Sequence, residues 1–148
     1  MEKGRYYGFY KFDNDEIRKS SGFTKTNFTI EITKLEGEYF SGWVEDDIST
    51  GGMEGRGIIS GYILRNRISF VKQMPHLTML YKNKTTGKYE RKIDTTRKHL
   101  PIYYEGTISG TDNYVGKWNF RYYNHLINIL VMFKRIKTGG TWEMSKVN

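Results

Sequence analysis

The chain has 148 residues, a formal net charge of +8 and no cysteine. This length is typical of one domain with a substantial hydrophobic core, so we expect residues 1–148 to form a single domain. Charged residues make up 27% of the chain and apolar residues 37%, which excludes an intrinsically disordered protein. The absence of cysteine excludes a disulfide framework, a thiolate metal site and a cysteine nucleophile.

The net charge limits the classes of binding partner, and the lack of long apolar segments limits the cellular location of the protein. A basic chain admits nucleic acid, an anionic membrane or an anionic small ligand as partner, although a solvated basic surface is the more common explanation. No run approaches the roughly 20 apolar residues that a membrane-spanning helix needs, and no signal-peptide core follows the first residues. We therefore expect a cytoplasmic protein without a membrane span, and the sequence specifies no oligomeric state.

The composition favours strands over helices. Alanine, the best helix former, is absent, whereas tyrosine, isoleucine, threonine, phenylalanine and glycine are abundant. Apolar residues and glycines alternate with polar residues at a period of two, which predicts strands with one buried face. In chain order, the predicted strands cover residues 4–12, 23–35, 38–46, 57–64, 67–74, 77–83, 88–94, 102–108, 114–120 and 141–147.

Two segments interrupt this alternation. Residues 13–22 are polar and turn-rich, which predicts a loop or one short helical turn. Residues 125–136 fit a strand with Ile127, Ile129 and Val131 on one face, and their leucines and isoleucines also recur at helical spacing. The β-branched content favours the strand.

Glycines recur on the inward register of five strands, at Gly8, Gly42, Gly61, Gly106 and Gly116. Inward glycines let strands coil tightly and leave room for an aromatic ring to lie over the backbone. A meander of antiparallel strands exposes its edges unless it closes on itself. We therefore predict an all-β fold, a single antiparallel up-and-down β-barrel of about eight to ten strands with little or no helix.

The order of the short motifs resembles a known group of proteins. The motifs are Phe40-x-Gly42-x-Val44-x-Asp46, Ile59-x-Gly61-x-Ile63, Ile68-x-Phe70-x-Lys72, Tyr104-x-Gly106-x-Ile108, Tyr114-x-Gly116-x-Trp118 and Gly140-Thr141-Trp142-x-Met144. This order resembles bacterial β-barrel domains that look like calycins, the broad grouping of lipocalins, fatty-acid-binding proteins and avidins. The chain departs from that pattern in the long loop after Asp46 and in the extended basic hairpin of residues 77–100. The resemblance implies a calycin-like barrel and brings no established activity.

The inward register places charged residues among apolar ones. Lys72 follows Phe70, and Arg91 lies between Tyr89 and Ile93. An unpaired buried cation is costly, so each needs an anionic ligand, a carboxylate or an exit to solvent. We therefore predict a lumen that binds a small, anionic and partly apolar ligand of the fatty-acid type. The predicted site residues are Lys72, Arg91, Tyr81, Tyr89, Tyr104, Phe70, Trp118 and Asp46.

The alternative is a barrel without a lumenal ligand. Lys72 then extends to solvent at the barrel mouth, Arg91 pairs with Asp94 or Glu90, and aromatic side chains fill the interior. In that case the protein is a non-catalytic structural or interaction domain.

The basic hairpin offers a further binding function. Its aromatic residues, Tyr81 and Tyr89, are interleaved with the cations Lys82, Lys84, Lys88, Arg91, Lys92, Arg97 and Lys98. A cationic groove with aromatic platforms suits single-stranded nucleic acid or another polyanion. Lysines more commonly block edge pairing on exposed hairpins, and no nucleic-acid-binding motif accompanies these.

Catalytic motifs are missing from the sequence. His76, His99 and His125 are far apart, lack the short spacing of metal ligands and are predicted to be surface or loop residues. The acidic run at 45–47 lacks the spacing of a calcium loop. There is neither a glycine-rich phosphate loop nor a Gly-x-Ser-x-Gly elbow. We therefore predict a protein that is not an enzyme and has no cofactor or metal.

Overall fold

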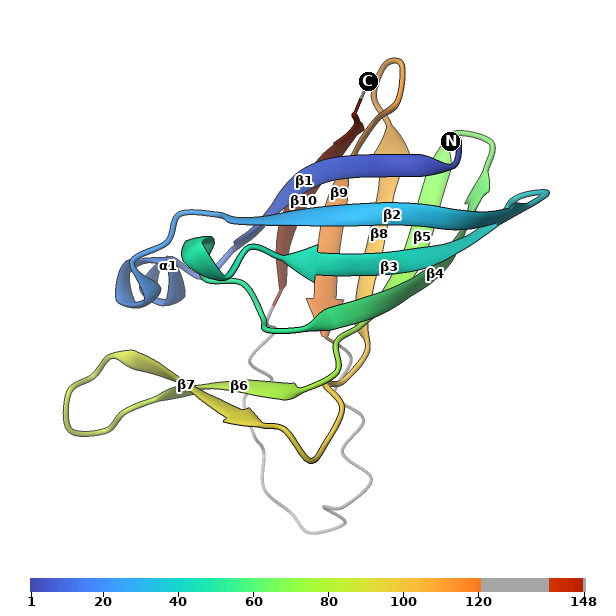
Figure 1. Cartoon of the computed structure of the whole chain (residues 1–148). Coiled ribbons are helices and arrows are strands. Elements are labelled where there is room, and N and C mark those ends of the chain that lie inside the picture. The colour runs from blue at the N-terminus through green and yellow to red at the C-terminus, as the bar shows by residue number, and fades with distance from the viewer. Residues whose placement is uncertain (121–138, 148) are drawn as a thin grey trace, which may run out of the picture.

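A computed structural model describes residues 1–120 and 139–147, and its main body is a closed antiparallel barrel of eight strands (Figure 1). The barrel strands are β1 (Gly4–Phe12), β2 (Thr26–Glu36), β3 (Tyr39–Asp46), β4 (Arg56–Leu64), β5 (Arg67–Gln73), β8 (Ile102–Ile108), β9 (Asn113–Phe120) and β10 (Gly139–Lys146). Each pairs with the next barrel strand along the chain, and β1 pairs with β10 to close the cylinder. The predicted all-β, up-and-down barrel is confirmed. The segment at 125–136 lies outside the described residues.

The basic hairpin lies outside the barrel wall. Its strands, β6 (Leu77–Lys82) and β7 (Tyr89–Asp94), pair with each other in a separate two-stranded sheet. The expectation that they extend the inward face of the barrel is wrong, because β5 pairs directly with β8, where Phe70 is opposite Tyr104. Pro75 follows β5 and has no N–H to continue the ladder, so the chain leaves the wall there and returns at β8.

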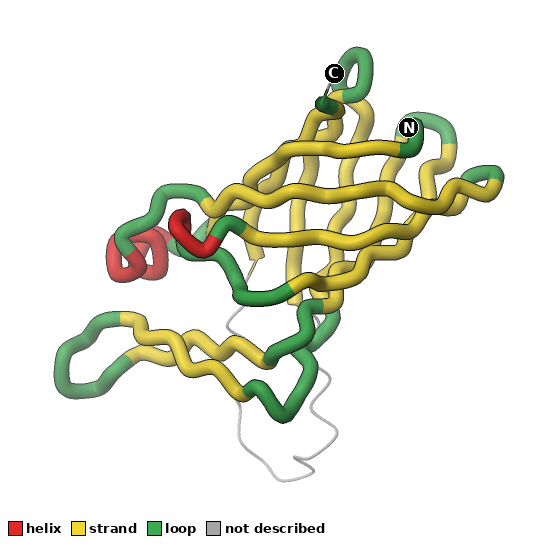
Figure 2. Tube along the Cα trace, viewed as in Figure 1, coloured by secondary structure: helices red, strands yellow, loops and turns green. Residues whose placement is uncertain are grey.

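Two short helices lie at the same end of the barrel as the hairpin, which we call the mouth (Figure 2). The predicted loop or helical turn at 13–22 contains the helix α1 (Asp15–Ser21), and the connection after β3 contains the single 3-10 turn η1 (Ile48–Thr50). Asn14 caps α1 by accepting hydrogen bonds from the N–H groups of Glu16 and Ile17, and the buried Ile17 anchors the helix.

The inward register that the alternation predicted is confirmed in the barrel. Phe28, Ile30 and Ile32 on β2 are at most 3% exposed, whereas the residues between them are more exposed. The same pattern holds on the other strands. The buried apolar set also includes Tyr6, Tyr10, Phe40, Val44, Ile59, Ile68, Phe70, Met74, Ile102, Tyr104, Tyr114, Trp118, Trp142 and Met144.

A pair of glycines makes room for a tryptophan inside the barrel. Gly106 on β8 is opposite Gly116 on β9, which is in turn opposite Trp142 on β10. A Cβ atom at Gly106 would lie only 2.8 Å from Cζ2 of the Trp142 ring. The indole N–H donates to the backbone carbonyls of Glu105 and Lys117, both at 3.2 Å, so its one polar atom is satisfied.

We expect the substitution Gly106→Ala to lower the free energy of unfolding by about 1–3 kcal/mol, since overpacking a close-packed interior costs this much. The added methyl group would meet the Val115 carbonyl oxygen at 2.2 Å and the Trp142 ring. Urea unfolding followed by tryptophan fluorescence measures the change. Thr107→Val is the control, because Thr107 is the exposed next residue on β8. Equal stabilities of the two variants would contradict the packing role of Gly106.

Candidate functional site at the barrel mouth

Lys72 and Asp46 form an ion pair inside the barrel, close to the mouth. Lys72 comes from β5, where it is opposite Ile59 of β4 and Ile102 of β8, and Asp46 ends β3. The Lys72 Nζ lies 2.5 Å from Oδ1 of Asp46, and their side chains are 2% and 0% exposed. β4 separates the two strands, so the pair joins segments that are not hydrogen-bonded neighbours.

The other carboxylate oxygen of Asp46 accepts two more hydrogen bonds. The Tyr10 hydroxyl donates to Oδ2 at 3.2 Å, and the backbone N–H of Met53 donates to it at 3.3 Å. The Lys72 ammonium also lies 5.1 Å from the centre of the Tyr10 ring. The carboxylate is therefore balanced by one cation and two neutral donors, as a buried charge requires.

Burial and the Asp46 charge shift the protonation of the groups around this pair. Burial lowers the pKa of the Lys72 ammonium, and the neighbouring Asp46 carboxylate opposes that effect. Burial also raises the pKa values of the Tyr10 and Tyr104 hydroxyls well above their usual range, and the negative charge of Asp46 adds to the rise. Both tyrosines stay neutral over the physiological pH range.

Of the three outcomes expected for Lys72, namely an anionic ligand, a carboxylate partner or an exit to solvent, the structure shows the carboxylate partner. The Lys72 side chain does not extend to solvent at the mouth, because the whole residue is only 1% exposed. Its charge is already neutralised by Asp46, which the sequence had placed on the same inward register as a separate ligand contact. A lumenal anion is therefore not needed to explain the buried lysine.

Removing one member of this pair should destabilise the protein more than removing both charges. We expect Lys72→Met to lower the free energy of unfolding by about 3–5 kcal/mol, because it leaves Asp46 buried without its cation. The double variant Lys72→Met/Asp46→Asn should recover much of this loss, since an asparagine oxygen still accepts from Tyr10 and Met53. Urea unfolding of the single and double variants measures the coupling, and strictly additive losses would contradict a direct pair.

The raised tyrosine pKa values predict an alkaline transition. The unfolded state ionises its tyrosines near pH 10, whereas folded Tyr10 and Tyr104 resist ionisation. Their contribution to stability is therefore complete below pH 10 and is lost as the pH rises toward the folded-state pKa values. Tyrosinate absorbance should show a slow class of tyrosines that ionises together with loss of the circular dichroism signal. Rapid ionisation of all 12 tyrosines without unfolding would contradict this.

Besides Lys72 and Asp46, three aromatic residues of the predicted lumen face the interior, where they pack against other aromatic rings. Phe70 stacks on Tyr104 with ring centroids 4.6 Å apart, and the Trp142 ring lies edge-on to Phe70 at 5.3 Å. Trp118 lies edge-on to Tyr10 at 5.6 Å. These are ordinary packing distances between aromatic side chains, as in the alternative in which such rings fill the barrel.

The other three predicted lumen residues lie on the hairpin, so their placement in the lumen is wrong. Tyr81 is 46% exposed and donates a hydrogen bond to Glu90, while Tyr89 and Arg91 lie on the neighbouring strand β7. The alternation of β6 and β7 is real, but it describes the two faces of a hairpin that lies beside the barrel. Glu90 is not the partner of Arg91, because it accepts hydrogen bonds from Tyr81 and Asn83. Asp94 pairs with Arg97 instead.

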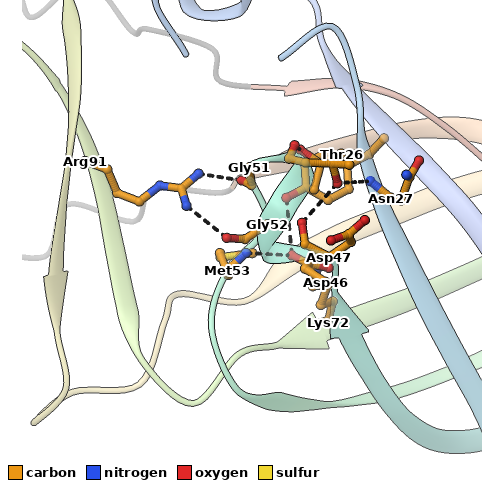
Figure 3. A network of polar contacts seen from close by, with 11 residues as sticks. Thr26, Asn27, Asp46, Asp47, Gly51, Gly52, Met53, Lys72 and Arg91 are labelled. Carbon is orange, nitrogen blue, oxygen red and sulfur yellow. Dashed lines mark hydrogen bonds and ion pairs between the residues drawn. The ribbon is translucent and has the colours of Figure 1, made fainter. Parts of the chain in front are cut away.

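Arg91 fastens the hairpin to the loop that follows β3 (Figure 3). Its guanidinium donates to the backbone carbonyls of Gly52 at 2.9 Å and Gly51 at 2.5 Å. The same loop donates the Met53 N–H to Asp46. A chain of polar contacts thus runs from β5 through Asp46 and the loop to β7, and it fixes the geometry of the mouth.

His99 packs between the base of the hairpin and the barrel, where its ring lies 5.3 Å from the Phe120 ring of β9. It is a loop residue, as expected, but it is only 5% exposed rather than a surface histidine. Its Nε2 lies 3.1 Å from the Thr78 carbonyl oxygen on β6, and its Nδ1 lies 2.7 Å from the Leu100 carbonyl oxygen. Burial lowers its pKa, while the two carbonyl oxygens oppose that effect, and a neutral ring donates to only one of them.

A hollow of about 300 Å³, the mouth pocket, lies between the barrel end, α1, η1 and the hairpin. Its apolar walls are formed by Tyr10, Phe12, Ile17, Phe23, Ile48, Leu80 and Tyr89. Its charged residues are Lys11, Lys25 and Arg91, and no carboxylate lines it in the described part of the chain. Phe23 and Ile48 are 38% and 61% exposed, so the pocket presents uncovered apolar surface beside positive charge.

A wider hollow of about 580 Å³ on the outer wall has the opposite character. It crosses the outer faces of β10, β1, β2 and β3, and its lining includes the carboxylates of Glu45, Asp47 and Glu143. An anionic ligand is repelled there and attracted at the mouth pocket.

Several cations of the basic hairpin already have partners. Lys82 pairs with Glu16 of α1 at 2.8 Å, Arg97 pairs with Asp94 at 2.7 Å, and Arg91 binds loop carbonyls. Binding of nucleic acid or another polyanion by residues 82–98 stays a prediction, and these contacts reduce the free positive charge available for it.

Reasoning from the sequence missed the two lysines of the mouth pocket. Lys11 lies on the outward face of β1, and Lys25 immediately precedes β2. Each resembles an ordinary surface lysine when it is considered alone. The available signal was that both lie in the predicted strands 4–12 and 23–35, which an up-and-down barrel places next to each other.

Comparison of the chain with family models, curated proteins and solved structures gave no match. Among the described residues, no helix is long and apolar enough to cross a membrane. Within residues 1–120 and 139–147, no group of three or more histidine or acidic side chains is arranged to hold a metal ion. The candidate site therefore rests on the geometry of the mouth itself.

Proposed function

We propose that this protein binds a small, anionic and partly apolar ligand in the mouth pocket, and that it acts as a binding protein rather than an enzyme. The observation that carries this proposal is the composition of the pocket. Aromatic and aliphatic walls surround about 300 Å³, three cations line it, and the described lining contains no carboxylate. Pockets with mostly apolar walls and a few placed polar groups are the usual form of small-molecule sites.

The barrel supports this function as a rigid scaffold. An eight-stranded closed barrel is compatible with the calycin-like resemblance, and we include membership of that grouping in the proposal. The ligand site differs from the lumenal site expected from the sequence, because Phe70, Tyr104 and Trp142 pack together in the interior. The proposed ligand is of the same class as the one expected from the sequence, but its site is the mouth pocket instead of the lumen.

Displacement of a fluorescent medium-chain fatty acid tests the proposal. The substitution Ile48→Glu places a carboxylate on the pocket wall, and we expect it to weaken binding by about tenfold or more because of like-charge repulsion. Ile58→Glu is a matched control, since Ile58 lies outside the pocket and is 63% exposed against 61% for Ile48. Absence of probe binding to the unaltered protein, or equal weakening by both substitutions, would refute the proposed site.

A further inference from the structure

Two of the cations near the mouth are already committed to partners within the protein. Lys72 is paired with Asp46 in the interior, and the Arg91 guanidinium donates to the carbonyls of Gly51 and Gly52. Lys72 is therefore neutralised, and two of the five N–H groups of Arg91 are held by the loop. The remaining positive charges of the mouth pocket are those of Lys11 and Lys25.

Lys11 and Lys25 lie next to the last residue pair of the β1–β2 ladder. Tyr10 of β1 is opposite Thr26 of β2, Lys11 follows Tyr10 and Lys25 precedes Thr26. Both ammonium groups approach the same ring, because Lys11 Nζ and Lys25 Nζ lie 5.2 Å and 4.7 Å from the centre of Phe9. In the described residues, neither lysine forms an ion pair.

This arrangement is unfavourable for the protein alone. Two like charges held beside the same ring repel each other. Phe9 offsets part of the repulsion through its ring, but a neutral ring does not neutralise two cations. Features that break a local rule of stability are expected at functional sites.

We propose that Lys11 and Lys25 together bind the head group of the ligand, and that this head group is a phosphate monoester. The inference rests on the proposed function and assigns the substrate class of the same pocket. A phosphate monoester carries a charge of about −1.5 to −2 near neutral pH and matches two ammonium groups, whereas a carboxylate carries a single charge. Both lysines are exposed and have flexible stems, so they can close on the oxygens from two sides.

The size of the pocket sets the remainder of the ligand. A volume of 300 Å³ corresponds to about ten water-sized groups, at roughly 30 Å³ each. Phe23, Ile48, Leu80 and Tyr89 supply the apolar surface that such a group would cover. The ligand is therefore a short alkyl or single-ring phosphate rather than a long-chain lipid.

Isothermal titration with four probes tests this assignment: octyl phosphate, octanoate, octanol and inorganic phosphate. The unaltered protein should bind octyl phosphate most tightly, with a strong dependence on salt. Octanol should bind weakly through the apolar walls without salt dependence. Inorganic phosphate should bind more weakly than octyl phosphate, because it leaves those walls uncovered, and equal affinities would identify free phosphate as the ligand and overturn the short-chain assignment.

The variant Lys11→Gln/Lys25→Gln should lose about tenfold or more of its affinity for octyl phosphate, since it removes two charge-assisted contacts. Its affinity for octanol should be unchanged, and its melting temperature should rise because the repulsion is removed. The control Lys3→Gln/Lys117→Gln removes the same charge from exposed lysines outside the pocket. Equal losses in both double variants would overturn the assignment and leave the mouth pocket as the ligand site.

The variant Arg91→Gln tests whether Arg91 positions the pocket wall or contacts the head group of the ligand directly. We expect it to weaken octyl phosphate and octanol by the same factor, because Arg91 holds the pocket wall through Gly51 and Gly52. A selective loss of octyl phosphate would instead make Arg91 the head-group ligand and contradict our assignment. If neither octyl phosphate nor octanol binds the unaltered protein, the proposed function fails together with this inference.

Discussion

The buried pair of Lys72 and Asp46 is the contact on which the mouth of the barrel depends. It joins β3 and β5 across the interior, so it links strands that backbone hydrogen bonds leave apart. Through Met53 it also fixes the loop after β3. An interior built from aromatic rings alone would pack as densely, but it would not determine where that loop lies. The cost of burying two charges is offset by the hydrogen bonds that satisfy them.

The cations at the mouth fall into two groups with different roles. Lys72 and Arg91 organise the protein, one inside the barrel and one between the hairpin and the loop. Lys11 and Lys25 face the pocket without carboxylate partners in the described residues. This division is the basis of the proposed anion site, because cations that are not satisfied internally are the ones left to attract a ligand. It also explains why positive charge alone, as counted from the sequence, does not locate the site.

Much of the barrel could be predicted from the sequence, because a period of two and inward glycines are local signals. Phe28, Ile30 and Ile32 were placed correctly for this reason. The same signal failed for β6 and β7, since alternation is identical in a barrel strand and in a hairpin beside the barrel. The Lys72–Asp46 pair was also out of reach. Both residues were placed inward, but their contact depends on how the sheet curves across β4, which no local pattern records.

The seam between β1 and β10 has a consequence for how the chain folds as it is made. Among the barrel strands, β1 leaves the ribosome before the others and β10 emerges after them. Until then β1 and β9 are open sheet edges, which can pair with other chains. The hairpins of β2 to β5 join near neighbours and can form early, whereas closure must wait until β10 has emerged. The nascent barrel is therefore an incomplete cylinder until β10 is made, and protection of its two edges by a chaperone would be most valuable during that time.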